Sequence, residues 1–161
     1  MFAGILTSPR AIVLEDPNFA AVTPPALGTQ EAQEAKEKAR ASILELNNLP
    51  EEQIVAQCLK LRPAWGLSEC QYWAPSKRLH HPNIALVKRN RPPVTELFPK
   101  ITCPTLILKA GAPAPQRLEN ERIARLLAKG KLVHIDGAGH NVRREGKAQT
   151  IEVLRTFLQG L

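Results

Sequence analysis

The stretch KLVHIDGAGHNVRREG, residues 131–146, joins an apolar run to a glycine-rich turn and then to a histidine. Residues 131–136 carry the β-branched and apolar side chains that are typical of a buried strand. Gly137 and Gly139 permit a tight turn, and His140 follows it immediately. A histidine at the carboxyl end of such a strand lies where open α/β sheets place their ligands. His140 is therefore our candidate general base, and the alternative is a histidine in a surface turn.

The segments around this stretch alternate between strand and helix patterns. CPTLILKAG (103–111) is typical of a buried strand, RLENERIARLLAKG (117–130) of an amphipathic helix that stops at a glycine, and KAQTIEVLRTFLQGL (147–161) of a closing helix. A third strand-like run lies at 11–14, within SPRAIVLEDPNF (8–19). This order predicts an α/β protein with a short parallel sheet covered by helices.

The middle of the chain has a different pattern. EAQEAKEKARASILEL (31–46) and PEEQIVAQCLKL (50–61) predict two helices, and SECQYWAPSKRL (68–79) and PNIALVKRN (82–90) predict two shorter ones. We therefore expect three regions: a strand in 1–20, a helical region over 21–97, and a core over 98–161.

Composition limits the classes of function. Hydrophobic residues make up 43% and charged residues 23%, as in ordinary globular proteins. No apolar run is long enough to cross a membrane, and the first residues do not predict a signal peptide. The net charge of +7 is spread along the chain, and aromatic residues are only 4%, so we expect no nucleic-acid partner.

The three cysteines, Cys58, Cys70 and Cys103, show no Cys-x-x-Cys spacing. We therefore expect neither a disulfide nor a zinc site, and a reducing cytoplasm fits this cysteine usage best. No metal and no cofactor are predicted.

ITCPTLILKAG, KLVHIDGAGHNVRRE and VLRTFL, in this order, resemble the C-terminal part of an α/β-hydrolase. The resemblance implies a partial α/β-hydrolase fold. Residues 1–20 would hold the core strand that follows the nucleophile helix, 21–97 the helical cap, and 98–161 the last core strands and helix. It also implies that His140 is the general base of an acyl-transfer reaction.

The nucleophile of that family lies in a Gly-x-Ser-x-Gly turn between a strand and a helix. The chain contains no such motif, because none of its four serines is flanked by glycines: Ser8, Ser42, Ser68 and Ser76. We therefore expect the nucleophile in an N-terminal half that precedes these residues, and we expect the isolated chain to be inactive.

The acid that orients the imidazole has to be a carboxylate. In the family it usually follows the strand matched by residues 103–111, but residues 111–116 contain no carboxylate. Asp16 ends an earlier strand, which is the acid position in some hydrolases, and the alternative is a turn aspartate before a proline. Asp136 fits a turn cap better, and Glu119 is a weaker candidate. We predict that Asp16 lies nearer His140 than any other carboxylate.

Two functions follow from these patterns. Completed by an N-terminal half, the chain would hydrolyse an ester or amide bond of a small molecule, and Trp65, Tyr72 and Trp73 would line the substrate pocket or pack in the core of the cap. The alternative is a non-catalytic binding module, which self-associates because a short sheet exposes an edge and an apolar face. The expected partner is a second copy of the chain in a homo-oligomer or a complementary N-terminal half.

Overall fold

A computed structural model describes residues 9–19, 29–87 and 92–161 of the chain. The chain divides into two compact units, Met1–Ala21 together with Pro92–Leu161, and Val22–Arg91. We call the first the sheet unit and the second the helical unit. Residues 92–97, which we expected in the helical region, belong to the sheet unit and contain the short helix α4 (Val94–Leu97).

Over residues 9–19 and 92–161, the sheet unit is built on three parallel strands, β1 (Ile12–Glu15), β2 (Thr105–Ala110) and β3 (Gly130–Ile135). Their order is β1-β2-β3, so the middle strand pairs with both neighbours. Parallel strands need crossover connections. Along the chain, the crossover from β2 to β3 contains a helix that packs on one face of the sheet. The prediction of an α/β fold with a short parallel sheet is confirmed.

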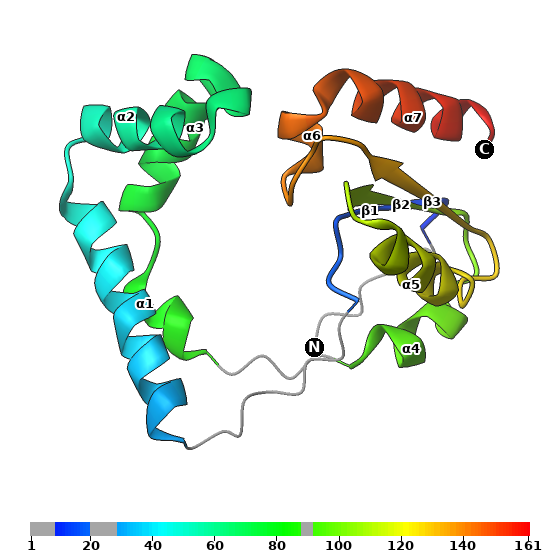
Figure 1. The fold of residues 1–161 in the computed structure, drawn as a ribbon, viewed down its shortest axis with the longest axis horizontal. Helices are drawn as coiled ribbons and strands as arrows, with labels where there is room; N and C mark the ends of the chain where they lie inside the picture. The colour runs from blue at the N-terminus through cyan, green and yellow to red at the C-terminus, as the bar shows by residue number, and fades with distance from the viewer. Residues whose placement is uncertain (1–8, 20–28, 88–91) are drawn as a thin grey trace, which may run out of the picture. The chain divides into compact units, whose positions relative to one another are not determined.

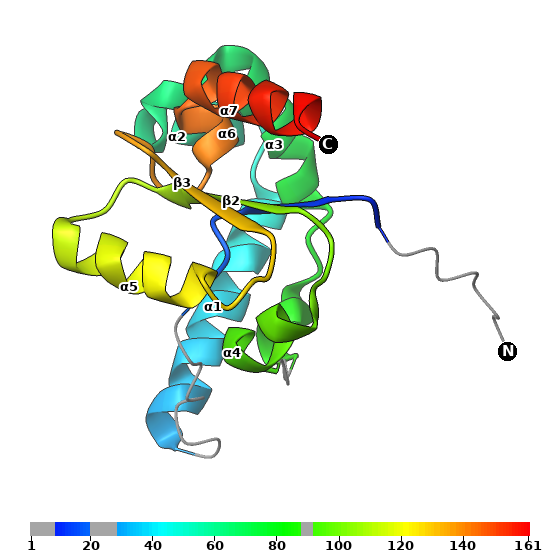
Figure 2. The same ribbon diagram turned by 90° about the vertical axis from the view of Figure 1, so that its right-hand side faces the viewer.

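Helices cover both faces of this sheet (Figures 1 and 2). On one face lie α4 and α5 (Ala114–Ala124), and on the other lie α6 (Val142–Glu145) and α7 (Lys147–Gln159). Successive β2 side chains point to opposite faces, so Ile107 joins the core beneath α5 while Leu106 and Leu108 join the core beneath α6 and α7. The sheet is therefore buried on both faces along β2.

The helix predicted over 117–130 is displaced, because α5 runs over Ala114–Ala124. It begins earlier because Pro115 is tolerated in the first turn of a helix. It ends earlier because the chain turns so that Leu127 is buried in the same core as Ile123. Gly130 is the first residue of β3, not a helix stop, and a Cβ there would lie 2.7 Å from Leu127 Cβ.

The described part of the helical unit contains three α-helices, α1 (Gln30–Asn48), α2 (Glu51–Leu61) and α3 (Gly66–Arg78). Short 3-10 helices follow α2 at Pro63–Trp65 and α3 at Pro82–Leu86, and a third, Phe98–Lys100, belongs to the sheet unit. Residues 88–90 of the last predicted helix lie outside the described residues. The described helices include none that is both long and apolar enough to cross a membrane.

The cysteine prediction is wrong, because Cys58 of α2 and Cys70 of α3 form a disulfide. The two residues are 12 positions apart in the sequence, and helix packing brings their Cα atoms to 5.6 Å. Sequence spacing alone could not reveal the pair, because the turn between the helices determines which cysteines meet. Cys103 is the free cysteine. Because two of the three cysteines are paired, cysteine usage no longer favours a reducing compartment.

Candidate active site

The end of β1 is shaped by Asp16. Its backbone N–H donates to Leu108 O at 2.7 Å, which extends the strand pairing by one residue. Its φ of +36° is unusual for a residue other than glycine. Its carboxylate folds back over the end of β2, where Oδ1 accepts a hydrogen bond from the Ala110 amide at 3.2 Å. The side chain is only 13% exposed, so these contacts fix its direction.

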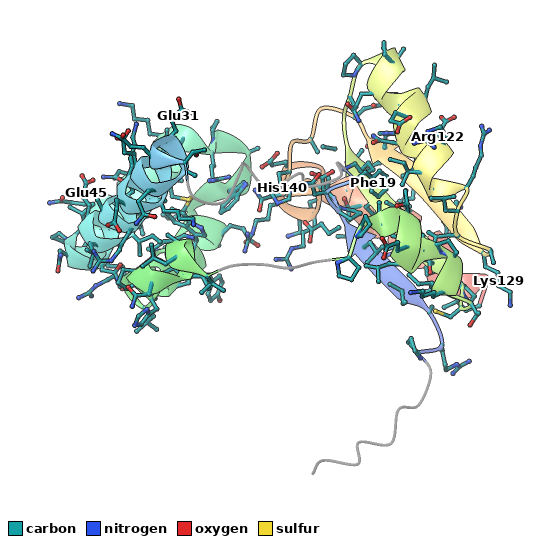
Figure 3. The ribbon with its side chains drawn as sticks, turned by 90° about the horizontal axis from the view of Figure 1, so that it is seen from below. Phe19, Glu31, Glu45, Arg122, Lys129 and His140 are labelled. Atoms are coloured by element: carbon teal, nitrogen blue, oxygen red, sulfur yellow. A yellow bond between two sulfur atoms is a disulfide. The ribbon has the colours of Figure 1, made fainter. Side chains whose placement is uncertain are left out.

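The loop after β3 places His140 beside this carboxylate. Gly137 has a φ of +74° and open space around its Cα, so the backbone conformation alone calls for glycine. Ala138 is buried against the sheet, and its carbonyl accepts from the Gly111 amide at 2.9 Å. The Gly139 amide donates to Glu145 Oε2 at 2.6 Å, which ties the loop to α6. His140 is labelled in Figure 3.

His140 Nδ1 lies 2.8 Å from Asp16 Oδ2, although the two residues are 124 positions apart in the sequence. An ionised carboxylate can only accept a hydrogen bond, so Nδ1 carries the proton and donates it. Nε2 is then the basic nitrogen, and the His140 side chain is 78% exposed. This is the arrangement in which an acid selects the tautomer of a general base.

The surroundings keep Asp16 ionised. Burial by itself raises the pKa of Asp16, but hydrogen bonds from Lys109, His140 and the Ala110 amide outweigh it and hold the pKa below the usual value of 3.8. The Nζ of Lys109 lies 2.6 Å from Asp16 Oδ1, on the other oxygen from the imidazole. The carboxylate therefore contacts two cationic or potentially cationic groups, one at each oxygen.

Other carboxylates of the sheet unit, including the two further sequence candidates for the acid role, Asp136 and Glu119, have partners elsewhere in the described structure. Asp136 does not point to His140 but forms an ion pair with Arg117 of α5. Glu119 pairs with Arg122 on the same helix at 2.7 Å. Glu15 pairs with Arg143 at 3.3 Å. Among the described residues, Asp16 is the carboxylate hydrogen-bonded to His140, as the sequence predicts.

The second histidine near this region has a different environment. His134 Nε2 lies 3.1 Å from Asn120 Nδ2, and Asn120 is almost completely buried between α5 and the sheet. Burial lowers the pKa of His134, and the positive charges of Arg117 and Lys109 lower it further. The lowered pKa favours the neutral imidazole, and the contact with buried Asn120 agrees with the packing role that the strand position of His134 predicts.

The structure brings no serine to His140 among the residues whose relative positions it defines. Ser42, Ser68 and Ser76 belong to helices of the helical unit, and Ser8 lies outside the described residues. The hydroxyls of Ser42 and Ser76 donate to backbone carbonyls of their own helices, at 3.1 and 2.6 Å.

The three candidate pocket aromatics differ in exposure. Trp65 is 6% exposed and packs edge-on against Trp73, with ring centroids 6.2 Å apart, beside the Cys58–Cys70 disulfide. Arg62 stacks over Trp65 at 4.5 Å. Tyr72, in contrast, is 81% exposed on the surface of α3. The two tryptophans thus contribute to the core of the helical unit, and Tyr72 does not.

Sequence reasoning missed Lys109, whose Nζ contacts the carboxylate of Asp16 directly. The available signal was a lysine inside the apolar run TLILKA, because a lysine within a buried strand needs an anionic partner.

Comparison with known proteins shows relatives in structure only. No family model matches the chain, and no curated protein sequence matches it. Its fold is similar to E-2-(acetamidomethylene)succinate hydrolase (TM-score 0.59, 16% identity, 93% of this chain and 57% of that one). It is also similar to MenH from S. aureus (TM-score 0.55, 20% identity, 94% and 59%) and to a thermophilic esterase from Thermogutta terrifontis (TM-score 0.52, 20% identity, 94% and 56%). The chain thus spans little more than half the length of these proteins.

Proposed function

Because the chain has a partial α/β-hydrolase fold, we propose that Asp16 and His140 are the acid and the base of a hydrolase for small-molecule esters or amides. The observation that supports this most is the 2.8 Å hydrogen bond between the two side chains at the carboxyl ends of β1 and β3. Two of the similar structures are a hydrolase and an esterase, which supports the same class of reaction.

The chemistry assigned to the pair is acyl transfer. A serine hydroxyl attacks the substrate carbonyl, and His140 Nε2 takes the hydroxyl proton. The imidazolium then gives this proton to the leaving alcohol or amine, and water hydrolyses the acyl-enzyme by the same route. Asp16 holds the Nδ1–H and stabilises the imidazolium. The reaction needs no cofactor.

The nucleophile and the oxyanion donors belong, in this proposal, to an N-terminal half that carries the Gly-x-Ser-x-Gly turn. Of the aromatic residues, Tyr72 and Trp73 remain candidates for substrate contact, whereas the burial of Trp65 favours a packing role.

The first prediction concerns labelling by a fluorophosphonate probe, which reacts with activated serines. We expect no stoichiometric labelling of the chain alone, because none of its serines lies in a nucleophile elbow. Co-expression with the N-terminal half of the Thermogutta esterase, which would supply the elbow, should give labelling on that half and hydrolysis of p-nitrophenyl esters. Mass spectrometry locates the label. Stoichiometric labelling of the chain alone would contradict the proposal, and so would a soluble complex that is never labelled.

A second function, self-association without catalysis, is favoured by one observation. β1 is an edge strand of the described sheet, and its Val13 side chain is 41% exposed. An exposed apolar edge strand is a template for pairing with another chain. The occupant in this alternative is a second copy of the chain, which would pair with β1 through its own β1.

The second prediction tests that alternative by sedimentation velocity at micromolar concentration. Self-association through β1 should give a dimer, and Val13→Lys should shift it to monomer, because an edge lysine opposes strand pairing. Leu79→Lys is the matched control, since Leu79 is 85% exposed in the helical unit and should leave the dimer intact. A monomeric wild-type chain would remove this alternative.

A further inference from the structure

We infer that Lys109 is a positioning residue that clamps the carboxylate of Asp16 and so holds the acid in place for His140. This inference rests on the proposed role of the Asp16–His140 pair. Lys109 is not expected to touch substrate, and its effect passes through Asp16.

The contacts of Lys109 all lie in the segment that follows β1. Its Nζ is 2.6 Å from Asp16 Oδ1, donates to Pro17 O at 2.9 Å, and lies 4.9 Å from the ring centroid of Phe19. One side chain of β2 thus holds three residues of the segment 16–19 against the sheet.

The clamp is a buried one. The side chains of Lys109 and Asp16 are each only 13% exposed, in contrast to an exposed surface pair, which contributes little. A lysine removed from water is costly unless a carboxylate and further acceptors surround the ammonium. The Asp16 carboxylate and the Pro17 carbonyl meet this requirement. The burial of Lys109 is therefore explained by its contacts with the segment 16–19.

The division of the two carboxylate oxygens supports a positioning role. Lys109 and the Ala110 amide occupy Oδ1, while His140 occupies Oδ2. With Oδ1 held by two donors, rotation of the carboxylate away from the imidazole would break two contacts at once. The positive φ of Asp16 indicates that its backbone is also held in place, because a residue other than glycine keeps such a conformation only where the surrounding structure stabilises it.

The other titratable groups near this end of the sheet contact partners other than the Oδ1 atom of Asp16. Glu15 of β1 pairs with Arg143 of α6, and Glu145 of α6 accepts from the Gly139 amide. His134, which is the β3 partner of Lys109 in the strand register, bonds with Asn120 of α5. Among the described residues, Lys109 is therefore the basic side chain, apart from His140, that contacts the Asp16 carboxylate.

The third prediction compares Lys109→Met, which keeps the length of the stem but removes the charge, with Lys109→Arg, which keeps the charge. The pKa of Asp16 is measured by NMR titration of its ¹³C-labelled carboxyl group in the chain alone. We expect Lys109→Met to raise this pKa by about one unit or more, because the raising effect of burial is then opposed by fewer partners. Lys109→Arg should leave it close to the wild-type value.

A second readout follows the orientation of the pair. Long-range ¹H–¹⁵N spectra report which nitrogen of His140 carries the proton. We expect the Nδ1–H tautomer in the wild type and in Lys109→Arg, and a mixture of tautomers in Lys109→Met, because the carboxylate is then free to turn away. A lysine that only stabilised the fold through its ion pair would also shift the titration of Asp16, so the tautomer of His140 is the readout that separates a positioning role from a structural one.

The backbone amide spectrum of the sheet unit verifies that each variant is folded, and Lys109→Gln replaces Lys109→Met if the latter is not. An unchanged pKa of Asp16, or an unchanged Nδ1–H tautomer of His140, in the folded uncharged variant overturns the inference. These measurements need no nucleophile, so they are independent of the labelling experiment that tests the proposed function.

Discussion

His140→Ala should lower kcat of the complemented hydrolase at least about a thousandfold, because in the proposed mechanism the imidazole takes the hydroxyl proton and the variant has no base in its place. The matched control is His134→Ala, which removes a histidine from the preceding strand. His134 bonds with buried Asn120 and not with Asp16, so its loss should affect stability while kcat stays near the wild-type value. The measurement is steady-state hydrolysis of p-nitrophenyl acetate by the two variants and the wild type, each complemented with the same N-terminal half.

Two results would count against this role of His140. A kcat that falls less than tenfold in His140→Ala would remove the imidazole from the proton transfer. An equal loss in both variants, together with a lost amide spectrum, would show damage to the sheet unit instead. In that case the contact of Asp16 with His140 should be tested by measuring the tautomer of His140, because this measurement does not depend on turnover.

Loss of the Cys58–Cys70 disulfide should lower the stability of the helical unit by about 2–4 kcal/mol. The bond closes a short loop between α2 and α3, and both cysteines are buried in a small cluster with Trp65. The helix α1 contributes no buried residue to the core, so the unit has little apolar burial with which to compensate. The double variant Cys58→Ala/Cys70→Ala and the reduced wild type should both unfold at lower urea concentration.

Tryptophan fluorescence measures this change in the right unit, because the two tryptophans of the chain, Trp65 and Trp73, both belong to it. Cys103→Ala is the control, since Cys103 is free and lies in the sheet unit. It should keep the wild-type midpoint and the wild-type response to reductant. Three reactive thiols in the unreduced, denatured chain, or an unchanged midpoint after full reduction, would show that the bond does not stabilise the unit.

Local patterns predicted the sheet unit well. The runs TLILKA and KLVHI carry side chains that fit strands buried on both faces, and residues 147–159 repeat apolar positions at helical spacing. The ends of elements were less predictable. α5 stops at Ala124 because Leu127 has to reach the core beside Ile107, and that contact depends on β2.

The residues of the candidate site also differ in how far local sequence predicted them. His140 was predictable because the glycine turn and the strand before it are neighbours in the sequence. For Asp16 the sequence left two interpretations, a turn residue before proline or an acid, since both agree with Asp-Pro after a strand. Only the parallel order β1-β2-β3, with the loops after β1 and β3 meeting over the end of β2, brings the carboxylate to the imidazole.

The sequence by itself determined which segments become strands and helices, because the spacing of apolar side chains and the positions of glycine and proline act over a few residues. It also determined that His140 follows a strand. Tertiary structure alone decided the pairing of Cys58 with Cys70, the choice of Asp16 among the carboxylates, and the contact of Lys109 with Asp16. The physical reason is that each of these contacts joins side chains from different elements, and its distance depends on how whole helices and strands pack.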